Sequence, residues 1–171
     1  MPNDKCQITN YMNDVYQILK NVLGDRLKVG EPLARYTTFK IGGPAQYFYE
    51  AKTKDELMLA VTIARKHQIG LFVFGGGSNI LVGDKGIGWF VVRNMTQKIS
   101  IVGVKGVRHK GQLRGNVFVE ADSGVIMNKL VRFTVEEGLR GLEMHLGLPG
   151  SVGGAVYMNS KWTHPTGYVG D

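Results

Sequence analysis

The feature that most constrains the fold of this chain is a run of three glycines between two short runs of β-forming residues. The stretch Gly75-Gly76-Gly77-Ser78-Asn79 joins the apolar residues 71–74 to the apolar residues 80–82. Three consecutive glycines exceed what a turn requires, and glycine lets another group approach the bare backbone. Successive N–H groups in such a loop can hold an anion, with the Ser78 hydroxyl and the Asn79 amide adding contacts. The stretch favours a phosphate or pyrophosphate cradle and a flexible hairpin loop about equally.

This loop matches neither of the two most familiar nucleotide-binding signatures. No Lys-Ser/Thr pair follows the glycines, as it does in the phosphate-binding loop of nucleoside triphosphatases. The Gly-x-Gly-x-x-Gly spacing of the Rossmann fingerprint is missing too, and a second β-like run follows in place of a helix. A nucleotide bound here is therefore expected in another architecture.

Length and composition are those of a globular protein. The 171 residues allow one or two small domains with a hydrophobic core, and 43% hydrophobic with 20% charged residues is an ordinary balance. No apolar run of about 18 residues indicates a membrane span, and residues 1–5 lack the apolar core of a signal peptide. The single cysteine, Cys6, cannot form an internal disulfide. We therefore expect a cytoplasmic protein without membrane contact.

The formal net charge of +7 suggests nucleic-acid binding as one possibility. Much of the basic excess lies in residues 105–114, which carry Lys105, Arg108, Lys110 and Arg114. This segment has no aromatic residue for base stacking, so a solvated hairpin or loop is favoured over a nucleic-acid site. A positive field also attracts a dinucleotide or a nucleotide-sugar. We expect no nucleic-acid partner.

Hydrophobic periodicity predicts three helices. The first covers residues 8–23 as a single apolar stripe. The second begins at the capping box of Thr53 and Glu56 and runs to about His67. The third covers about residues 125–137, with Ser123 as its N-cap and Gly138 at its end. The residues expected to face the core are Tyr11, Val15, Ile18, Leu19 and Val22, then Leu57, Ala60, Val61 and Ala64, and finally Ile126, Leu130, Phe133 and Val135.

Strands are predicted between these helices. A short strand through Phe39 and Ile41 is expected to end at Gly42-Gly43-Pro44. The other β-forming runs are residues 46–51, 71–74, 89–92, 99–102 and 117–121. Strand, helix and strand follow one another over residues 46–74, which indicates an α/β layer. Gly42 and Gly43 form either a structural turn or a second approach of the backbone to a ligand, to which Thr37 and Thr38 would offer hydroxyls.

A second glycine-rich segment spans residues 147–154 and contains four glycines and a proline. Flexible linkers of this glycine content are polar and rich in serine, whereas Leu148 and Val152 interrupt this one and Ala155 and Val156 follow it. An ordered loop is therefore favoured. Small residues there allow close packing against a flat ligand or present N–H groups to phosphate.

Four segments together resemble the UDP-N-acetylenolpyruvoylglucosamine reductase family, also called UDP-N-acetylmuramate dehydrogenases. They are Thr37-Thr38-Phe39-Lys40-Ile41-Gly42-Gly43-Pro44-Ala45, Gly75-Gly76-Gly77-Ser78-Asn79-Ile80-Leu81-Val82, Gly138-Leu139-Arg140-Gly141-Leu142-Glu143 and Gly147-Leu148-Pro149-Gly150-Ser151-Val152-Gly153-Gly154-Ala155-Val156-Tyr157-Met158-Asn159. Each segment alone is a weak signal, but four of them in this order over residues 34–159 are specific.

The resemblance implies an α/β fold of the vanillyl-alcohol-oxidase type, in which two small subdomains hold FAD between them. The implied division is a leader helix at residues 1–30, a first FAD-binding subdomain at 31–98 and a second, incomplete one at 99–171, without the carboxy-terminal substrate domain. In this family NADPH reduces the flavin, which delivers hydride to the enolpyruvyl double bond of a UDP-sugar during bacterial cell-wall synthesis. An enzyme acid protonates the neighbouring carbon.

The resemblance also implies which residues contact the cofactor. Residues 75–79 are expected to hold the FAD pyrophosphate, and residues 147–154 to close the flavin site from the second subdomain. The candidate cofactor-binding residues are Thr38, Gly75, Gly76, Gly77, Ser78, Asn79, Gly124, Gly147, Pro149, Gly150, Ser151, Val152, Gly153, Gly154 and Asn159.

No catalytic residue is assigned. The family's proton-donating serine, its Tyr-Arg pair and its late glutamate lie beyond the matched region, and neither Ser151 nor His145 takes their role. The sequence also departs from the family's Ala-Gly-Ala-Tyr-Gly-like run after Asn159. The expected function is the FAD-binding part of an NADPH-dependent reductase. The alternative is a non-catalytic flavin- or nucleotide-binding module. A strand layer without its covering domain should leave an apolar face exposed.

Metal chemistry and serine-hydrolase chemistry have little support in the sequence. The four histidines are scattered, and none pairs with a cysteine at ligand spacing. Gly77-Ser78 lacks the nucleophile-elbow pattern that a hydrolase serine requires. We therefore expect no metal site.

Overall fold

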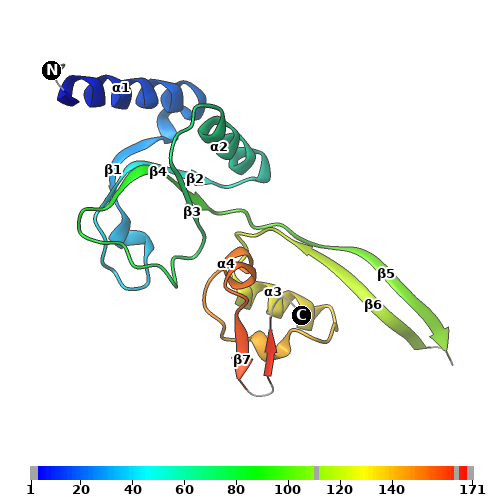
Figure 1. Cartoon of the computed structure of the whole chain (residues 1–171). Helices are drawn as coiled ribbons and strands as arrows, with labels where there is room; N and C mark the ends of the chain where they lie inside the picture. Colours follow the sequence, from blue (N-terminus) through cyan, green and yellow to red (C-terminus); the bar gives the residue numbers. More distant parts are fainter. Residues whose placement is uncertain (1–3, 110–111, 164–165, 169–171) are drawn as a thin grey trace. The chain divides into compact units, whose positions relative to one another are not determined.

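The computed structural model describes residues 4–109, 112–163 and 166–168 (Figure 1). Contacts within the chain divide it into two compact units, Met1–Asn94 and Met95–Asp171, which are described one at a time. The predicted division into a leader helix and two subdomains, with boundaries after residues 30 and 98, stays a prediction. No helix within the described ranges is both long and apolar enough to span a membrane.

The first unit is built on a four-stranded sheet in the order β1-β2-β4-β3. The strands are β1 (Lys28–Pro32), β2 (Pro44–Ala51), β3 (Leu71–Phe74) and β4 (Ile87–Asn94). Both β2 and β3 run parallel to β4, whereas β1 is antiparallel to β2. The helix α2 (Lys54–Lys66) connects β2 to β3. The predicted strand–helix–strand unit is therefore confirmed, with β4 inserted between its two strands.

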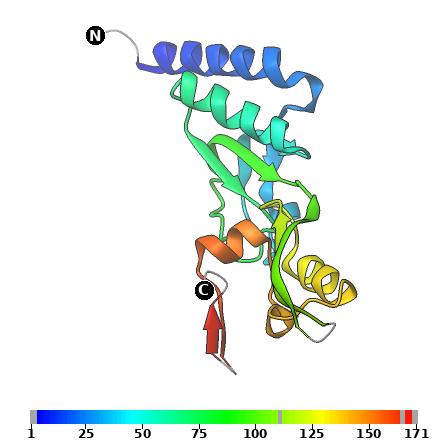
Figure 2. The ribbon, with the colours of Figure 1, turned by 90° about the vertical axis from the view of Figure 1, so that its right-hand side faces the viewer.

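Successive side chains of the central strands point to opposite faces of the sheet, so the sheet has a hydrophobic core on each face. Tyr47 and Phe90 point to the face that is covered by α1 (Asp4–Leu23) and α2, and both helices lie on the same side of the sheet in Figures 1 and 2. Phe48 and Val91, the next residues along the same strands, pack on the opposite face. That face is covered by the 3-10 helix η2 (Leu33–Tyr36) and by the segment that leads to β4.

The buried side of α1 differs slightly from the predicted stripe. Val15, Leu19 and Leu23 are buried, and their spacing of four residues places them on one face. Val22 is 37% exposed, so its predicted core position is wrong. Leu23, immediately before the 3-10 helix η1 (Gly24–Arg26), takes that place because it continues the spacing of Val15 and Leu19.

The predicted capping box at the start of α2 is confirmed. Thr53 Oγ1 accepts the N–H of Glu56 at 3.2 Å, and the Glu56 carboxylate accepts the N–H of Lys52 at 2.7 Å. Arg26 Nη1 lies 2.5 Å from Glu56 Oε1. The hydrogen bond from Arg26, followed by that from the Lys52 N–H, lowers the pKa of Glu56 to about 2.

The other end of α2 closes with a non-glycine residue in the left-handed region. Gln68 has a φ of 53°, and the N–H of Ile69 donates to the carbonyl of Ala64 at 2.8 Å. This is the Schellman arrangement, in which glycine usually holds the position of Gln68. Of the predicted core residues in α2, Ala60 and Ala64 are buried.

The predicted strand through Phe39 and Ile41 is wrong. The segment turns at Lys40, which has a φ of 57°, and the two apolar side chains are 58% and 52% exposed. The buried Thr37 hydroxyl donates to the Ile41 carbonyl at 3.0 Å, so it closes the segment into a turn. Side-chain bonds of this kind offer the backbone an alternative to a strand ladder.

Residues 80–82 also form no strand. Val82 is buried in the core on the face of the sheet that Phe48 and Val91 share, whereas Leu81 is 72% exposed. The apolar pattern that suggested a strand therefore comes from one buried side chain in a loop without a ladder partner.

The second unit begins with a long antiparallel hairpin of β5 (Ile99–His109) and β6 (Gln112–Ala121). It includes most of the basic segment 105–114, so of the two structures predicted there the hairpin is confirmed. Lys110 lies outside the described residues. In the part of the chain that the structure describes, no third strand joins this pair, and Ile101, Val104 and Phe118 are each more than 40% exposed.

The helix α3 (Met127–Glu136) follows the hairpin. Its buried residues are Met127, Leu130, Val131 and Thr134. The predicted core positions Ile126 and Val135 are wrong, because these side chains are 39% and 53% exposed.

The predicted N-cap of α3, Ser123, is wrong as well. The N-cap position is Ile126, and no side chain caps it. Ser123 lies three residues earlier because residues 123–126 run alongside a second segment, to which the Ser123 carbonyl is hydrogen-bonded. Gly138, with a φ of 69°, closes the helix as predicted.

The remaining elements of this unit are short. They are the 3-10 helix η3 (Glu143–His145), the helix α4 (Val152–Tyr157), and the antiparallel pair β7 (Lys161–Thr163) and β8 (Thr166–Tyr168).

Candidate functional site

The loop Gly75–Asn79 leaves β3 with its backbone donors free. Among the described residues, none of its five N–H groups donates a hydrogen bond. Gly75, Gly76 and Ser78 are half-buried, and Asn79 is exposed. Unsatisfied donors that are partly shielded from water form an anion-binding concavity when they converge. The cradle interpretation requires such free donors, and anion binding by this loop stays a prediction.

One side of the loop is fixed by the turn that follows η2. The N–H of Thr38 donates to the Gly77 carbonyl at 3.0 Å, so these two predicted site residues are neighbours. Gly77 is buried and has a φ of 69°. A Cβ built on Gly77 would lie 2.0 Å from the Tyr36 carbonyl oxygen, so only glycine fits between the two segments.

Tyr36 is itself held in place by several groups. Its ring stacks on the buried Phe48 with centroids 4.6 Å apart, and its hydroxyl donates to Glu31 at 2.5 Å. Lys28 Nζ lies 3.2 Å from the same hydroxyl. Burial, and then the bond to Glu31, raise the pKa of Tyr36, while that bond lowers the pKa of Glu31. Gly77 therefore packs against the backbone of a residue whose side chain is held by several contacts.

Gly42 and Gly43 have a structural role. The N–H of Gly43 donates to the Gly83 carbonyl at 3.0 Å, and a Cβ on Gly43 would lie 2.1 Å from the Asp84 carbonyl oxygen. The close approach at these glycines is therefore between two segments of this chain, and the turn interpretation is favoured over a second approach to a ligand.

In the second unit, the glycine-rich segment is largely tied to the protein. Residues 150–153 run beside residues 123–127: Met127 N–H donates to the Gly150 carbonyl at 3.0 Å, and Val152 N–H donates to the Val125 carbonyl at 2.8 Å. Gly153 N–H donates to the Ser123 carbonyl at 2.8 Å. This segment therefore offers fewer free donors than Gly75–Asn79.

Three predicted site residues in or after this segment have local structural roles. The buried Ser151 hydroxyl caps α4 by accepting the N–H of Gly154 at 3.4 Å. Asn159 has a φ of 43° and closes the same helix. Pro149 is exposed in the loop before α4. Their contacts with a cofactor stay predictions.

Three side chains that the sequence did not single out hold the candidate residues. Asn128 Oδ1 accepts the N–H of Gly147 at 2.6 Å. The Thr96 hydroxyl accepts the N–H of the buried Gly124 at 3.2 Å, and Gln97 Nε2 donates to the Gly124 carbonyl at 2.9 Å. These partners lie 19 to 28 residues apart in sequence, so no local pattern could have identified them.

The predicted residues therefore form two groups. Thr38 lies beside Gly75–Asn79 in the first unit, and Gly124 lies beside Ser151–Gly153 in the second. Across the described ranges, no three acidic, cysteine or histidine residues are gathered as potential metal ligands.

Comparison with known proteins gives the family. The model of the FAD-binding domain family matches residues 45–168, which is more than half of the chain. The UDP-N-acetylenolpyruvoylglucosamine reductase of Treponema denticola is 40% identical over 154 residues, covering 88% of this chain and 45% of that protein. The reductase of the same name from Rubrobacter xylanophilus is 43% identical over 133 residues, covering 78% and 41%.

A solved structure agrees with these matches. The crystal structure of UDP-N-acetylenolpyruvylglucosamine reductase from Thermus caldophilus superposes with a TM-score of 0.60 at 31% identity, covering 85% of this chain and 45% of that one. The chain thus spans less than half the length of the relatives named here. The predicted mixed α/β fold of FAD-binding type is confirmed, and the chain belongs to the FAD-binding domain family.

Proposed function

We propose that this chain is the FAD-binding part of a cytoplasmic, NADPH-dependent reductase that converts UDP-N-acetylglucosamine enolpyruvate to UDP-N-acetylmuramate in peptidoglycan synthesis. The observation that carries the proposal is the set of free N–H groups in Gly75–Asn79, in a chain that belongs to an FAD-binding family. The similarity to reductases of that name supports the substrate and the pathway.

The residues of the first unit fit a pyrophosphate. Consecutive N–H groups bind a phosphate oxygen without a cation, and the Ser78 hydroxyl and Asn79 amide add donors at the end of the same loop. The contact from Thr38 to Gly77 fixes the loop before any ligand arrives, which lowers the entropy cost of binding.

The residues of the second unit supply a rigid wall. Because most N–H groups of residues 147–154 bond to the protein, this segment fits the packing of a flat ring system better than the binding of phosphate. Gly153 packs directly on Ser123, where a Cβ would lie 2.9 Å from the Ser123 Cβ.

Bound FAD would supply the hydride carrier for reducing the enolpyruvyl double bond. The task of this chain would be to hold the dinucleotide, orient its ring and keep water away from it. We assign no proton-donating residue here.

The test is a titration of the purified chain with FAD, followed by gel filtration and a visible absorption spectrum. We expect binding at micromolar concentration, with retained flavin absorbance that NADPH bleaches. Asn79→Asp places a negative charge in the proposed cradle and should weaken FAD binding at least about tenfold. Asn116→Asp, an exposed site on β6, makes the same charge change away from the loop and should change binding less than about twofold.

The outcomes separate the candidate functions. A chain that folds but binds no FAD, or equal FAD affinity for both variants, would refute the cradle. Retained FAD together with NADPH bleaching but no turnover of the UDP-sugar would leave a flavin-binding module as the function of this chain.

A further inference from the structure

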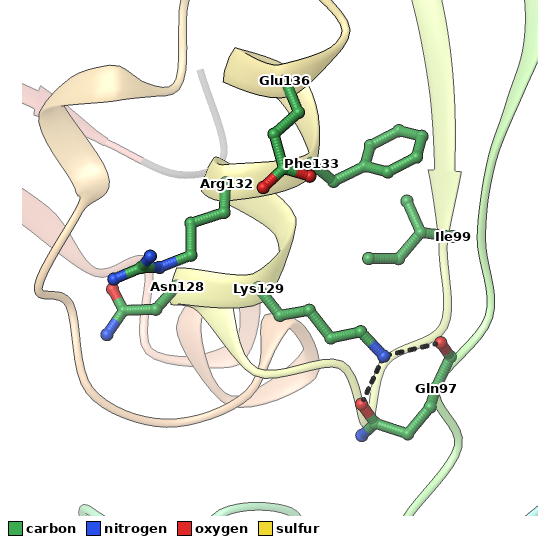
Figure 3. A pocket seen from close by; sticks show the side chains of 7 residues that line it. All are labelled: Gln97, Ile99, Asn128, Lys129, Arg132, Phe133 and Glu136. Carbon is green, nitrogen blue, oxygen red and sulfur yellow. Dashed lines mark hydrogen bonds between the residues drawn. The ribbon is translucent and has the colours of Figure 1, made fainter.

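A pocket in the second unit lies outside the residues proposed to bind FAD. It opens between α3 and the beginning of β5 and has a volume of about 570 Å³ (Figure 3). Sites for small organic molecules fall in this size range. All of its lining residues belong to residues 97–136, so the pocket is complete within one unit.

One side of the pocket is apolar. Phe133 projects from α3 toward Ile99, and both side chains are half-buried on the same side of the opening (Figure 3). An apolar ligand group that displaces water from this side would gain about 25 cal/mol for each Å² it buries.

Of the three charged side chains in the pocket, Lys129 has hydrogen-bond partners, whereas Arg132 and Glu136 have no ion-pair partner among the described residues. Lys129 Nζ lies 3.3 Å from Gln97 Oε1 and 3.5 Å from the Gln97 carbonyl oxygen, at the lower end of the pocket as drawn in Figure 3. Arg132 and Glu136 form no ion pair with any described residue. They stand four residues apart on the helix, so their side chains begin about 6 Å from each other.

Asn128 lines the pocket from the same helix as the free cation. Its side-chain oxygen accepts the N–H of Gly147, so the amide orientation is fixed. Figure 3 shows Asn128 and Arg132 on the side of the pocket opposite Phe133. The Arg132 guanidinium offers a fork of N–H donors that suits a carboxylate.

We propose that this pocket binds a free α-amino acid with an apolar side chain. The carboxylate lies against Arg132, the ammonium group lies against Glu136, and the side chain covers Phe133 and Ile99. A zwitterion suits the site because the two unpaired charges of opposite sign stand on adjacent helical turns. A polyphosphate suits it less, because Glu136 would repel it.

The test is calorimetric titration of the chain, without FAD, with L-leucine. We expect saturable binding with a Kd below about 1 mM. 4-Methylpentanoate, which lacks the ammonium, and 3-methylbutylamine, which lacks the carboxylate, should each bind at least about tenfold more weakly. In a nuclear magnetic resonance titration with leucine, the amide resonance of Gly147 should shift, because this N–H is bonded to Asn128.

Two variants and a control locate the site. Arg132→Gln and Glu136→Gln should each weaken leucine binding at least about tenfold. Arg65→Gln removes an exposed cation from α2 in the first unit and should leave binding unchanged. All three positions are exposed, so unfolding is not expected, and circular dichroism checks this.

Leucine binding that is undetectable at about 20 mM, or equal for Arg132→Gln and Arg65→Gln, would overturn the proposal. The result does not depend on FAD. A failure here therefore leaves the flavin proposal standing, and a failure of that proposal leaves this one standing.

Discussion

Gly77→Ala is the most informative single change in the first unit. Gly77 has a φ of 69°, and a Cβ built there would lie 2.0 Å from the Tyr36 carbonyl oxygen. An ordinary van der Waals contact needs 3.4 Å, so the loop and the Tyr36–Thr38 segment would have to separate by about 1.4 Å. That separation breaks the 3.0 Å bond from the Thr38 N–H to the Gly77 carbonyl.

Two costs add up in this variant. Placing a side chain in the left-handed region costs about 1–2 kcal/mol, and losing a partly buried hydrogen bond costs about 1 kcal/mol. The free energy of unfolding should therefore fall by about 2–3 kcal/mol. FAD binding should weaken at least about tenfold, because the N–H groups of the loop move with Gly77.

A matched control separates backbone strain from the collision. Gly24 has a φ of 62°, but a Cβ there would meet no atom within 4 Å. Gly24→Ala should therefore cost about 1–2 kcal/mol and leave FAD affinity unchanged. Urea unfolding followed by circular dichroism gives the stabilities, and flavin fluorescence gives the affinities. Equal losses of stability and equal FAD affinities in the two alanine variants would refute the reasoning.

Three further predictions concern other contacts. The pKa of Glu56 is lowered from 4.5 to about 2, so its stabilising effect is present above pH 4.5 and is lost as the pH falls toward 2. Because the ion pair with Arg26 is partly exposed, Glu56→Gln should cost only about 1 kcal/mol at pH 7, and a pH series of urea unfolding should show that difference vanish near pH 2. Gln68→Gly should stabilise the chain by about 1 kcal/mol in urea unfolding, since glycine adopts the left-handed conformation without strain; a loss of stability would contradict this. Asn128→Leu leaves the Gly147 N–H without its partner and should speed the hydrogen exchange of that amide at least about tenfold, whereas unchanged exchange would show that the 2.6 Å bond is not maintained.

Sequence patterns predicted the structure correctly where residues close in sequence determine it. The capping box at Thr53 and Glu56 is present with its hydrogen bonds, and the runs at residues 71–74 and 89–92 lie in strands. Each of these features depends on residues close in sequence, so local chemistry decides the structure.

Predictions failed where a distant partner or a turn decided the outcome. Phe39 and Ile41 alternate like strand residues, but the hydroxyl of the buried Thr37 closes a turn around Lys40. Ser123 has the composition of an N-cap, but its carbonyl pairs with Gly153, 30 residues later in the chain, and α3 begins after it. Sequence periodicity carries no information on such pairings.

For the candidate site, the sequence identified the two glycine-rich segments but not the hydrogen bonds that each one makes. The glycines of residues 75–79 and 147–154 identified both segments, because each needs a bare backbone at some position. The sequence could not tell that the first segment keeps its N–H groups free while the second uses most of them in hydrogen bonds within the protein, three of them to residues 123–128. That difference depends on the Asn128 and Ser123 contacts, which only the fold provides.

The strand order of the first unit has a consequence for the timing of folding. β2 and β3 are neighbours of β4 and not of each other, and β4 is the last of the four strands to be synthesised. A nascent chain that ends before residue 87 can pair β1 with β2, but its β3 has no partner in the sheet. The apolar faces of β2 and β3 then stay accessible until residues 87–94 leave the ribosome, and exposed apolar strands of this kind are prone to aggregate.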